Sequence, residues 1–373
     1  MGISRKFSFN YILNCVIVFL KSYWIEIFLF LLVVSRLIFF VYNYPVSYWD
    51  ETTNIYVVKS LVKSKQFFNL TYWNQGFFEK PPIWYFITSL LSLTFGSSYI
   101  VYRITAFIAS VIFSYMLFKI AKAEFSRSFG IISLIVFLSI NFIFRPAYSY
   151  HSSHTFASAD LDSLHLLFLF LSLIFYKKWI DGLFKKVDFL IANLFVALSF
   201  LTKGPMAFVA IFLVFLFLLF QGKSFKFLLK WLILSLIVNL VVIIPWYLYM
   251  YNLYRDEFLQ IHFGYHIVKR LAYSLEGHNE SWYFYLKILL DPKEFLFGFL
   301  VFPAIVFNLI SKRLKKFWVF VPTIGITVIL VFLMILQTKL AWYLFYIIPF
   351  YPFVITNFLI NIKNAFKMFI TTF

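Results

Sequence analysis

Two acidic residues open a segment that has the spacing of a short helix. The stretch SYWDETTNIYVVKSL places Asp50 and Glu51 before apolar residues that recur three or four positions apart. This spacing predicts an amphipathic helix on the membrane surface, starting at Asp50. The Asp50 carboxylate could act as a general base. The structural alternative is an N-cap, in which the side chain accepts a free backbone N–H.

A second polar stretch, FFEKPP, sets Glu79 and Lys80 directly before two prolines. A lysine is a compact point charge that suits phosphate, so Lys80 could bind an anion. Pro-Pro would halt any preceding helix. The structural alternative is a turn whose exposed Glu-Lys pair contributes little to stability.

Further charges lie at the ends of apolar runs. Asp160 and Asp162 lie at the start of the apolar run in SADLDSLHLLF. Burying a carboxylate at the mouth of a membrane span costs free energy, so such residues are candidates for a functional role. An acid also favours a helix start, and the sequence does not decide between the two aspartates. Lys203, in LSFLTKGPMAF, is followed by a Gly-Pro turn that would form a helix hairpin without explaining the lysine. Lys339, in QTKLAWY, raises the same question.

A histidine pair suggests a metal. His262 and His266 lie four positions apart in QIHFGYHIVKR, so they would share one helical face, and Arg270 continues that face. Glu79 would be the third ligand of a divalent metal if the two segments meet. Such a pair without a third ligand is more often structural, so the sequence requires no cofactor.

The elements that must position these residues are membrane helices. Of 373 residues, 63% are hydrophobic and 13% are charged, against about 25% charged in soluble domains. The runs 205–220 and 231–250 approach or reach the roughly 20 residues that cross a bilayer. The chain lacks the alternating pattern of an outer-membrane barrel. It is therefore predicted to be an all-α integral membrane protein.

The basic residues indicate the topology. They fall in short clusters between apolar runs, which is the positive-inside pattern and argues against a nucleic-acid partner, despite a net charge of +18. If the run 82–95 lies in the outer interface instead of crossing, every cluster falls on the cytoplasmic side. Ten spans result, and both termini are cytoplasmic. We expect no removable signal peptide, because no small-residue cleavage site follows the short run 11–20.

The outward face then gathers the candidate residues. Its two long segments are the loops 44–98 and 251–294, and both belong to a single transmembrane domain, 1–373, without a separate C-terminal soluble domain. Lys and Arg are normally less frequent on the outward side of a membrane protein. We therefore expect these outward cations to bind an anionic ligand. A lipid-linked phosphate is a suitable anion, because its apolar chain stays in the bilayer while its head lies at the surface.

Several stretches resemble, in the same order, the polyprenyl-phosphate-dependent glycosyltransferases of the GT-C type. This group contains aminoarabinose–lipid A transferases, which are the more similar branch, and protein O-mannosyltransferases. The EKPP and LTKG elements are specific, and the resemblance covers about 40–365. The stretches are WDETTNIYVVKSL, GFFEKPPIWYFITSLLSLTFG, YRITAF, DSLHLLFLFLSL, LSFLTKGPMAF, PWYLYM, HFGYHIVKR, GHNESWYFYL and TKLAWYLFYIIPFYP.

The resemblance implies a GT-C bundle of about ten transmembrane helices, with outward juxtamembrane helices in the first and fourth outer loops. It implies roles for individual residues as well. Asp50 matches the catalytic acid of the first loop, and Asp162 or Asp160 matches the second outer acid. The remaining matches are the phosphate-site pair Glu79 and Lys80 and the outward cations Lys203, Arg270 and Lys339, although Ala341 replaces the usual proline after Lys-Leu.

The implied reaction moves a sugar, aminoarabinose-like or hexose, from a polyprenyl-phosphate donor to a lipid, glycan or protein acceptor, with inversion. We expect a monomer in the cell (inner, cytoplasmic) membrane, with its site on the periplasmic or extracellular face. The alternative is a transporter or flippase of lipid-linked sugars, which needs charges part-way across the bilayer. Only Arg36 lies well inside a predicted span. A scaffold gives no reason for carboxylates beside a phosphate site.

Overall fold

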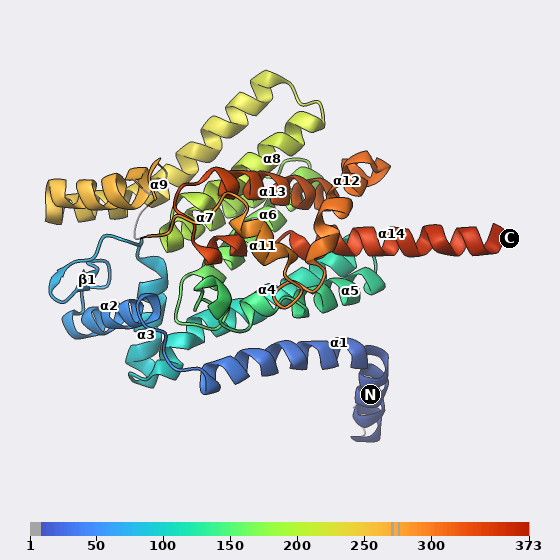
Figure 1. Cartoon of the computed structure of the whole chain (residues 1–373), viewed down its shortest axis with the longest axis horizontal. Helices are drawn as coiled ribbons and strands as arrows, with labels where there is room; N and C mark the ends of the chain where they lie inside the picture. Colours follow the sequence, from blue (N-terminus) through green and yellow to red (C-terminus); the bar gives the residue numbers. More distant parts are fainter. Residues whose placement is uncertain (1–8, 270–271, 275–276, 373) are drawn as a thin grey trace, which may run out of the picture.

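The fold is mostly helical. The computed structural model describes residues 9–269, 272–274 and 277–372, and Figure 1 labels its elements. Among the described residues, a short antiparallel hairpin is the β-structure that forms strands: β1 (Thr71–Tyr72) pairs with β2 (Gln75–Gly76). The helices are α1 (Phe9–Asn43), α2 (Asp50–Ser64), α3 (Ile83–Phe95), α4 (Tyr99–Glu124), α5 (Arg127–Leu138), α6 (Asp162–Asp181), α7 (Lys186–Lys203), α8 (Val209–Phe220), α9 (Phe225–Phe258), α11 (Phe284–Leu290), α12 (Val301–Ile310), α13 (Phe317–Ile335) and α14 (Tyr351–Thr372).

Several described helices can cross a membrane. Five are long and apolar enough, and a sixth span is possible where Ala341–Ile347 meets Tyr351–Lys363 at 56°. The chain is therefore a multi-pass membrane protein, and the total of ten spans stays a prediction. α3 has 13 residues, so it is about 20 Å long and too short for a hydrocarbon core of about 30 Å. The five are Ser22–Asn43, Tyr99–Glu124, Asp162–Asp181, Phe225–His266 and Phe317–Ile335.

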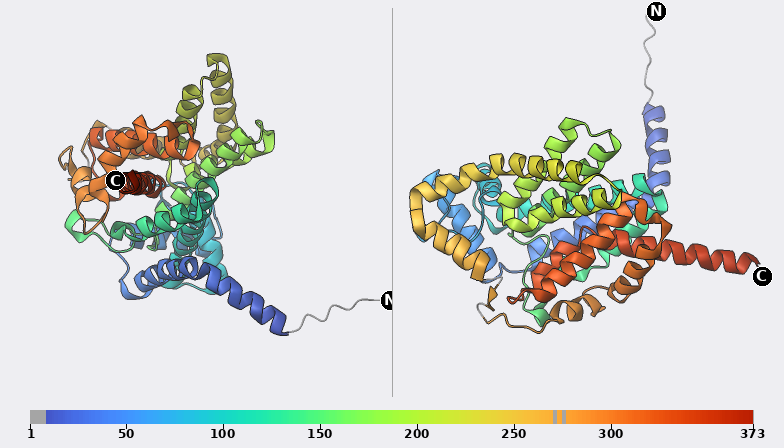
Figure 2. Two further views of the ribbon diagram at one scale, coloured as in Figure 1. Left: turned by 90° about the vertical axis from the view of Figure 1, so that its right-hand side faces the viewer. Right: turned by 90° about the horizontal axis from the view of Figure 1, so that it is seen from above.

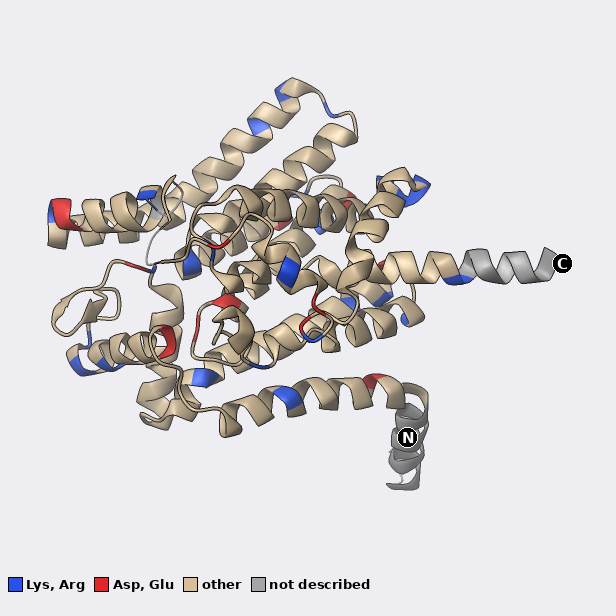
Figure 3. Ribbon diagram, in the orientation of Figure 1, with Lys and Arg blue, Asp and Glu red and all other residues tan. Residues whose placement is uncertain are grey.

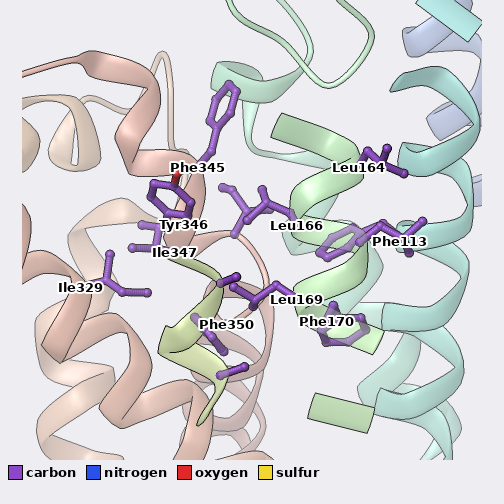
Figure 4. Close-up of a cluster of buried hydrophobic side chains, with 14 of the residues drawn as sticks. Phe113, Leu164, Leu166, Leu169, Phe170, Ile329, Phe345, Tyr346, Ile347 and Phe350 are labelled. Atoms are coloured by element: carbon purple, nitrogen blue, oxygen red, sulfur yellow. The ribbon is translucent and has the colours of Figure 1, made fainter. Parts of the chain in front are cut away.

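α6 lies in the centre of the helical bundle and packs against α4, α7 and α8. Figure 4 shows Leu166 and Leu169 of α6 on the side of Ile347, and Phe170 of α6 beside Phe113 of α4. All five side chains are buried. Because α6 packs against three helices, its first residue, Asp162, has a fixed position.

The ends of the helices sort into two groups. The start of α1 and the end of α14 lie at the same end of the molecule as the connection between α8 and α9, whereas α2, the hairpin and the second half of α9 lie at the opposite end (Figures 1 and 2). Figure 3 shows Lys and Arg on the α8–α9 connection and on the turn after α12. This arrangement agrees with the predicted topology, in which basic clusters and both termini share one side.

A buried ion pair fixes the start of α2. Arg103 of α4 donates to both carboxylate oxygens of Glu51, at 2.7 and 2.9 Å, and neither side chain is exposed. The same guanidinium donates to the carbonyl oxygens of Val41, Tyr44 and Pro45. Glu51 also accepts the backbone N–H of Ala159 at 2.7 Å. The end of α1, the start of α2 and the segment before α6 are therefore held together by one ion pair.

Candidate active site

Asp50 is the first residue of α2, as the spacing predicted. Its Oδ2 accepts a hydrogen bond from Nε2 of His154 at 2.8 Å, and its side chain is 25% exposed. Trp49 occupies the N-cap position, where no side chain caps the helix. The structure therefore does not support the N-cap alternative for Asp50, and the carboxylate is available for another role.

His154 joins three carboxylates. Its Nδ1 lies 3.1 Å from Oδ2 of Asp162 and 3.3 Å from Oδ2 of Asp160, while Nε2 faces Asp50. The imidazole stacks on Trp342, with ring centroids 4.1 Å apart and planes 7° apart, and is 4% exposed. Analysis of the sequence missed this residue, because SYHSSHTF matches no motif. The one available signal was a histidine in the outer segment shortly before two aspartates.

Asp162 and Lys203 form a buried ion pair. The Lys203 ammonium donates to Oδ1 of Asp162, and the two side chains are 9% and 2% exposed. Lys203 is the last residue of α7, and Gly204 follows with φ +110°. A side chain is strained at such a φ, so Gly204 permits the sharp turn that leaves Lys203 beside Asp162. The hairpin turn expected from LTKGP is confirmed, and the lysine has a specific partner.

Asp160 belongs to a hydrogen-bond network that joins α2, α3 and the start of α6. Its Oδ1 accepts from Asn54 Nδ2 at 2.9 Å, and its Oδ2 accepts from Ser158 Oγ at 3.2 Å. Asn54 in turn accepts from the Tyr85 hydroxyl at 2.6 Å. Both predicted acids, Asp160 and Asp162, therefore contact His154, and the structure does not reduce the choice to one of them.

The electrostatics of this group favour a cationic histidine. Burial opposes charge on His154, but Asp160, Asp162 and Asp50 raise the pKa of its imidazole to about 10. Burial would also raise the pKa of Asp50, yet the hydrogen bond and charge of His154 hold it well below its usual range. Burial raises the pKa of Asp160 to about 6, against the opposing charge of His154. At neutral pH His154 is therefore an imidazolium beside an ionised Asp50.

A cavity of about 500 Å³ lies beside this group. Its lining combines charged residues with an apolar wall that α13 and the 3₁₀ helix Ala341–Ile347 contribute. The charged and histidine lining residues are Asp50, Glu79, Lys80, Lys203, His266 and His278. The apolar wall includes Phe332, Leu333, Leu336, Trp342 and Tyr343. The structure thus brings one predicted catalytic acid and two predicted phosphate-binding lysines to the same space.

One predicted cation, Lys339, is not among the lining residues of the cavity. The Lys339 ammonium donates to the carbonyl oxygens of Leu333 at 3.2 Å, Met334 at 3.0 Å and Leu336, around the end of α13. The residue is 5% exposed, and burial lowers its pKa. A cation is favourable at a helix C-terminus, so this geometry gives Lys339 a capping role instead of a phosphate contact. Arg270 lies outside the described residues.

The proposed metal set does not form. Nδ1 of His262 lies 2.7 Å from the Phe78 carbonyl oxygen, and Nε2 lies 3.0 Å from the Tyr247 hydroxyl. Among the described residues, no group of three or more His, Cys, Asp or Glu could hold a metal ion. The combination of Glu79, His262 and His266 was therefore wrong as a ligand set. His262 instead holds the backbone directly before Glu79, because the π-helix Leu259–Lys269 packs it there.

The chain is similar to known membrane glycosyltransferases. Residues 79–249 match the family described as dolichyl-phosphate-mannose-protein mannosyltransferase. An uncharacterized protein of Aquifex aeolicus is 28% identical over 332 residues, which are 86% of this chain and 61% of that protein. The undecaprenyl phosphate-alpha-4-amino-4-deoxy-L-arabinose arabinosyl transferase of Pseudomonas savastanoi pv. phaseolicola is 23% identical over 247 residues, which are 65% of this chain and 44% of that protein.

The fold has a solved counterpart. The crystal structure of ArnT from Cupriavidus metallidurans bound to undecaprenyl phosphate matches with a TM-score of 0.71 at 16% identity, over 89% of this chain and 59% of ArnT. The arrangement of the helices is thus a GT-C membrane fold similar to that of ArnT. The resemblance to polyprenyl-phosphate-dependent GT-C glycosyltransferases is confirmed. The chain spans 44% to 61% of the length of these three relatives.

Proposed function

We propose that the chain is a glycosyltransferase that moves a sugar from a polyprenyl-phosphate donor to an acceptor at the outer face of the cell membrane. One observation carries the proposal: Asp50, Lys80 and Lys203 line the same cavity as a set of apolar side chains from α13 and the 3₁₀ helix Ala341–Ile347. Such a space suits a ligand with a phosphate head and a hydrocarbon tail. The family match and the ArnT-type fold support the same reaction class.

In the proposed reaction, the donor phosphate binds between Lys80 and Lys203, and the isoprenoid units next to it lie along the wall formed by α13. The acceptor attacks the anomeric carbon from the face opposite the phosphate, so the configuration inverts. The bond between the anomeric carbon and the phosphate oxygen breaks, and its electron pair leaves with the phosphate. The two lysines are most useful at this point, because positive charge stabilises the charge that develops on the leaving group.

Asp50 acts on the acceptor side. If the acceptor is a hydroxyl, the Asp50 carboxylate takes its proton as the new bond forms. The low pKa of Asp50 makes that transfer late, when the attacking oxygen already carries positive charge. If the acceptor is a phosphate, no base is needed, and Asp50 orients the donor or the acceptor. No cofactor is required in either case. The acceptor is a lipid, a glycan or a protein, and the enzyme acts as a monomer.

The test measures transfer directly. The purified protein in lipid nanodiscs receives a radiolabelled polyprenyl-phosphate sugar together with extracted envelope acceptors, and label on the acceptor is counted. In proteoliposomes the same label reports movement across the bilayer. Transfer without movement supports the proposal, and movement without transfer would show a flippase. Mass spectrometry of lipid A, glycans and surface proteins from cells with and without the gene identifies the acceptor.

The flippase alternative has little support in the described spans. Arg36, the cation that lies well inside a predicted span, donates to the carbonyl oxygen of Leu138 and, at 2.8 Å, to Oδ1 of Asn141. Its guanidinium also lies 4.2 Å from the centre of the Phe144 ring. These contacts use the charge for packing between α1 and the segment after α5.

A further inference from the structure

His154 is the centre of the charged group, yet no residue motif and none of the steps above gives it a role. Its two ring nitrogens face different elements. Nε2 bonds to Asp50 at the start of α2, and Nδ1 faces Asp162 at the start of α6. A histidine that only filled space in the core would not need carboxylates on both sides.

The ring has one orientation that serves these contacts. Trp342 lies parallel to the imidazole at 4.1 Å and comes from a third element, the helix Ala341–Ile347. Stacking fixes the plane of the ring, so the two in-plane N–H groups have fixed directions. Nε2 takes Oδ2 of Asp50, and this leaves Oδ1 as the oxygen for a ligand in the cavity that Asp50 lines.

We propose that His154 is a positioning residue whose two ring nitrogens both donate to carboxylates, and that it thereby turns one oxygen of Asp50 toward the acceptor. It does so by joining Asp50 to the Asp162–Lys203 ion pair in one chain of hydrogen bonds. The inference rests on the proposed function, because it assigns His154 a place in the same transfer reaction.

The charges around His154 explain why the cation matters. The groups that face it or act on it are Asp50 from α2, Asp160 and Asp162 before and at the start of α6, Lys203 from α7 through Asp162, and Lys80 through its charge on Asp50. Without a cation at position 154, three carboxylates converge on a neutral group. Like charges this close disfavour ionisation, so Asp50 would gain a proton more readily and lose its fixed orientation.

Two neutral variants separate the two sides of the ring. In His154→Gln the amide can replace the donor at Nε2 toward Asp50, and in His154→Asn it can replace the donor at Nδ1 toward Asp162. The matched control is His151→Asn, since His151 is exposed in the same loop and its left-handed φ of 53° suits asparagine. Each variant is assayed for transfer from a radiolabelled polyprenyl-phosphate sugar, over a range of pH and donor concentration.

The expected result is a split between kcat and KM. In His154→Asn, which has no donor toward Asp50, kcat falls about 10- to 100-fold because Asp50 is misplaced. In His154→Gln, which keeps that donor but not the charge, kcat falls less. In both variants KM for the donor changes less than about threefold because Lys80 and Lys203 are unaltered. The acid limb of the kcat profile also moves to higher pH, since Asp50 has lost its adjacent cation. His151→Asn behaves as wild type. The pH profile is also measured in an Asp160→Asn background. The pKa of Asp160 is raised to about 6, so its titration could otherwise be mistaken for that of Asp50.

Two sets of results would contradict these proposals, one for His154 and one for the proposed function. If the neutral variants keep the wild-type kcat and acid limb, or if kcat falls while the limb stays in place, His154 is a structural residue and the inference is wrong. If wild-type protein transfers no sugar under any condition, the proposed function fails first. Folding is monitored by thermal unfolding, and His154→Lys, which restores a cation, should recover part of the acid-side activity if the charge is what matters.

Discussion

Lys203 at the end of α7 donates a hydrogen bond to Asp162 at the start of α6, 41 residues earlier in the chain. Both side chains are largely buried. Removing one member of a buried ion pair costs about 3–5 kcal/mol, since an uncompensated charge is left behind. Variants at Asp162 and Lys203 therefore change stability as well as chemistry. Substitutions at other residues of the site test the mechanism more cleanly.

Asp50→Asn tests the carboxylate itself. The amide keeps the shape of the side chain but cannot accept a proton, so we expect transfer to fall about 100-fold or more if Asp50 is the base. Binding of undecaprenyl phosphate, measured by competition with the labelled donor, should change little. Full retained activity would remove Asp50 from the mechanism.

Lys80→Ala tests the phosphate contact. A hydrogen bond to a charged group is worth about 1.5–3 kcal/mol, so we expect the apparent affinity for the donor to fall about 10- to 150-fold. Steady-state kinetics with varied donor measure this change. Lys63→Ala, at an exposed position on α2, is the matched control. A Lys80 variant that cannot be told from the control would contradict the assignment.

Lys339→Gln tests the capping role. The variant loses charge at the end of α13, where the ammonium meets three carbonyl groups, so the melting temperature should fall. KM for the donor should stay within about twofold, because the loss of a helix cap acts mainly on stability. A large rise in KM with unchanged stability would restore the predicted phosphate contact.

Arg103→Met should be among the most destabilising substitutions in the chain. It leaves Glu51 buried and unpaired, which costs about 3–5 kcal/mol. Asp181→Asn breaks the more exposed Lys177–Asp181 pair and should change stability by less than about 1 kcal/mol. Thermal unfolding in detergent compares the two, and equal losses would argue against the ion pair as the anchor of α2.

The stability of the protein should depend on pH through His154. Its pKa is raised from an ordinary 6.5 to about 10, so its contribution is complete below the unfolded pKa and is lost as pH rises through the folded pKa. The difference in melting temperature between wild type and His154→Gln should therefore be largest near pH 6.5 and shrink toward pH 10. A difference that does not vary with pH would mean that His154 is neutral in the folded protein.

The sequence predicted the elements whose signal is local. The apolar spacing after Asp50 gave α2 its first residue, and the Pro-Pro after Lys80 is followed by a helix, α3 (Ile83–Phe95), over the predicted run. Gly204-Pro205 was correctly predicted as a hairpin turn. Each of these depends on residues within a few positions of one another, where propensity and periodicity are informative.

The site residues that were missed depend on tertiary contacts. His154 lies 104 positions from Asp50, and Arg103 lies 52 positions from Glu51. No spacing rule reaches so far. Lys339 was assigned to phosphate because it faces outward by topology, yet its ammonium turns back to the nearest helix end. The side of a membrane can be predicted from charge bias, but the direction of one side chain cannot.

Negative and positive groups alternate along Asp50, His154, Asp162 and Lys203, and with His154 protonated their charges sum to zero. A lysine that already has a carboxylate partner retains a phosphate less tightly than a solitary lysine. In the proposed reaction, the carrier phosphate that is released carries more charge than the donor phosphate, and it meets a lysine already balanced by Asp162. In the proposed reaction, the alternating charges therefore favour fast release of the product as well as binding of the substrate. Product release limits the rate of many enzymes.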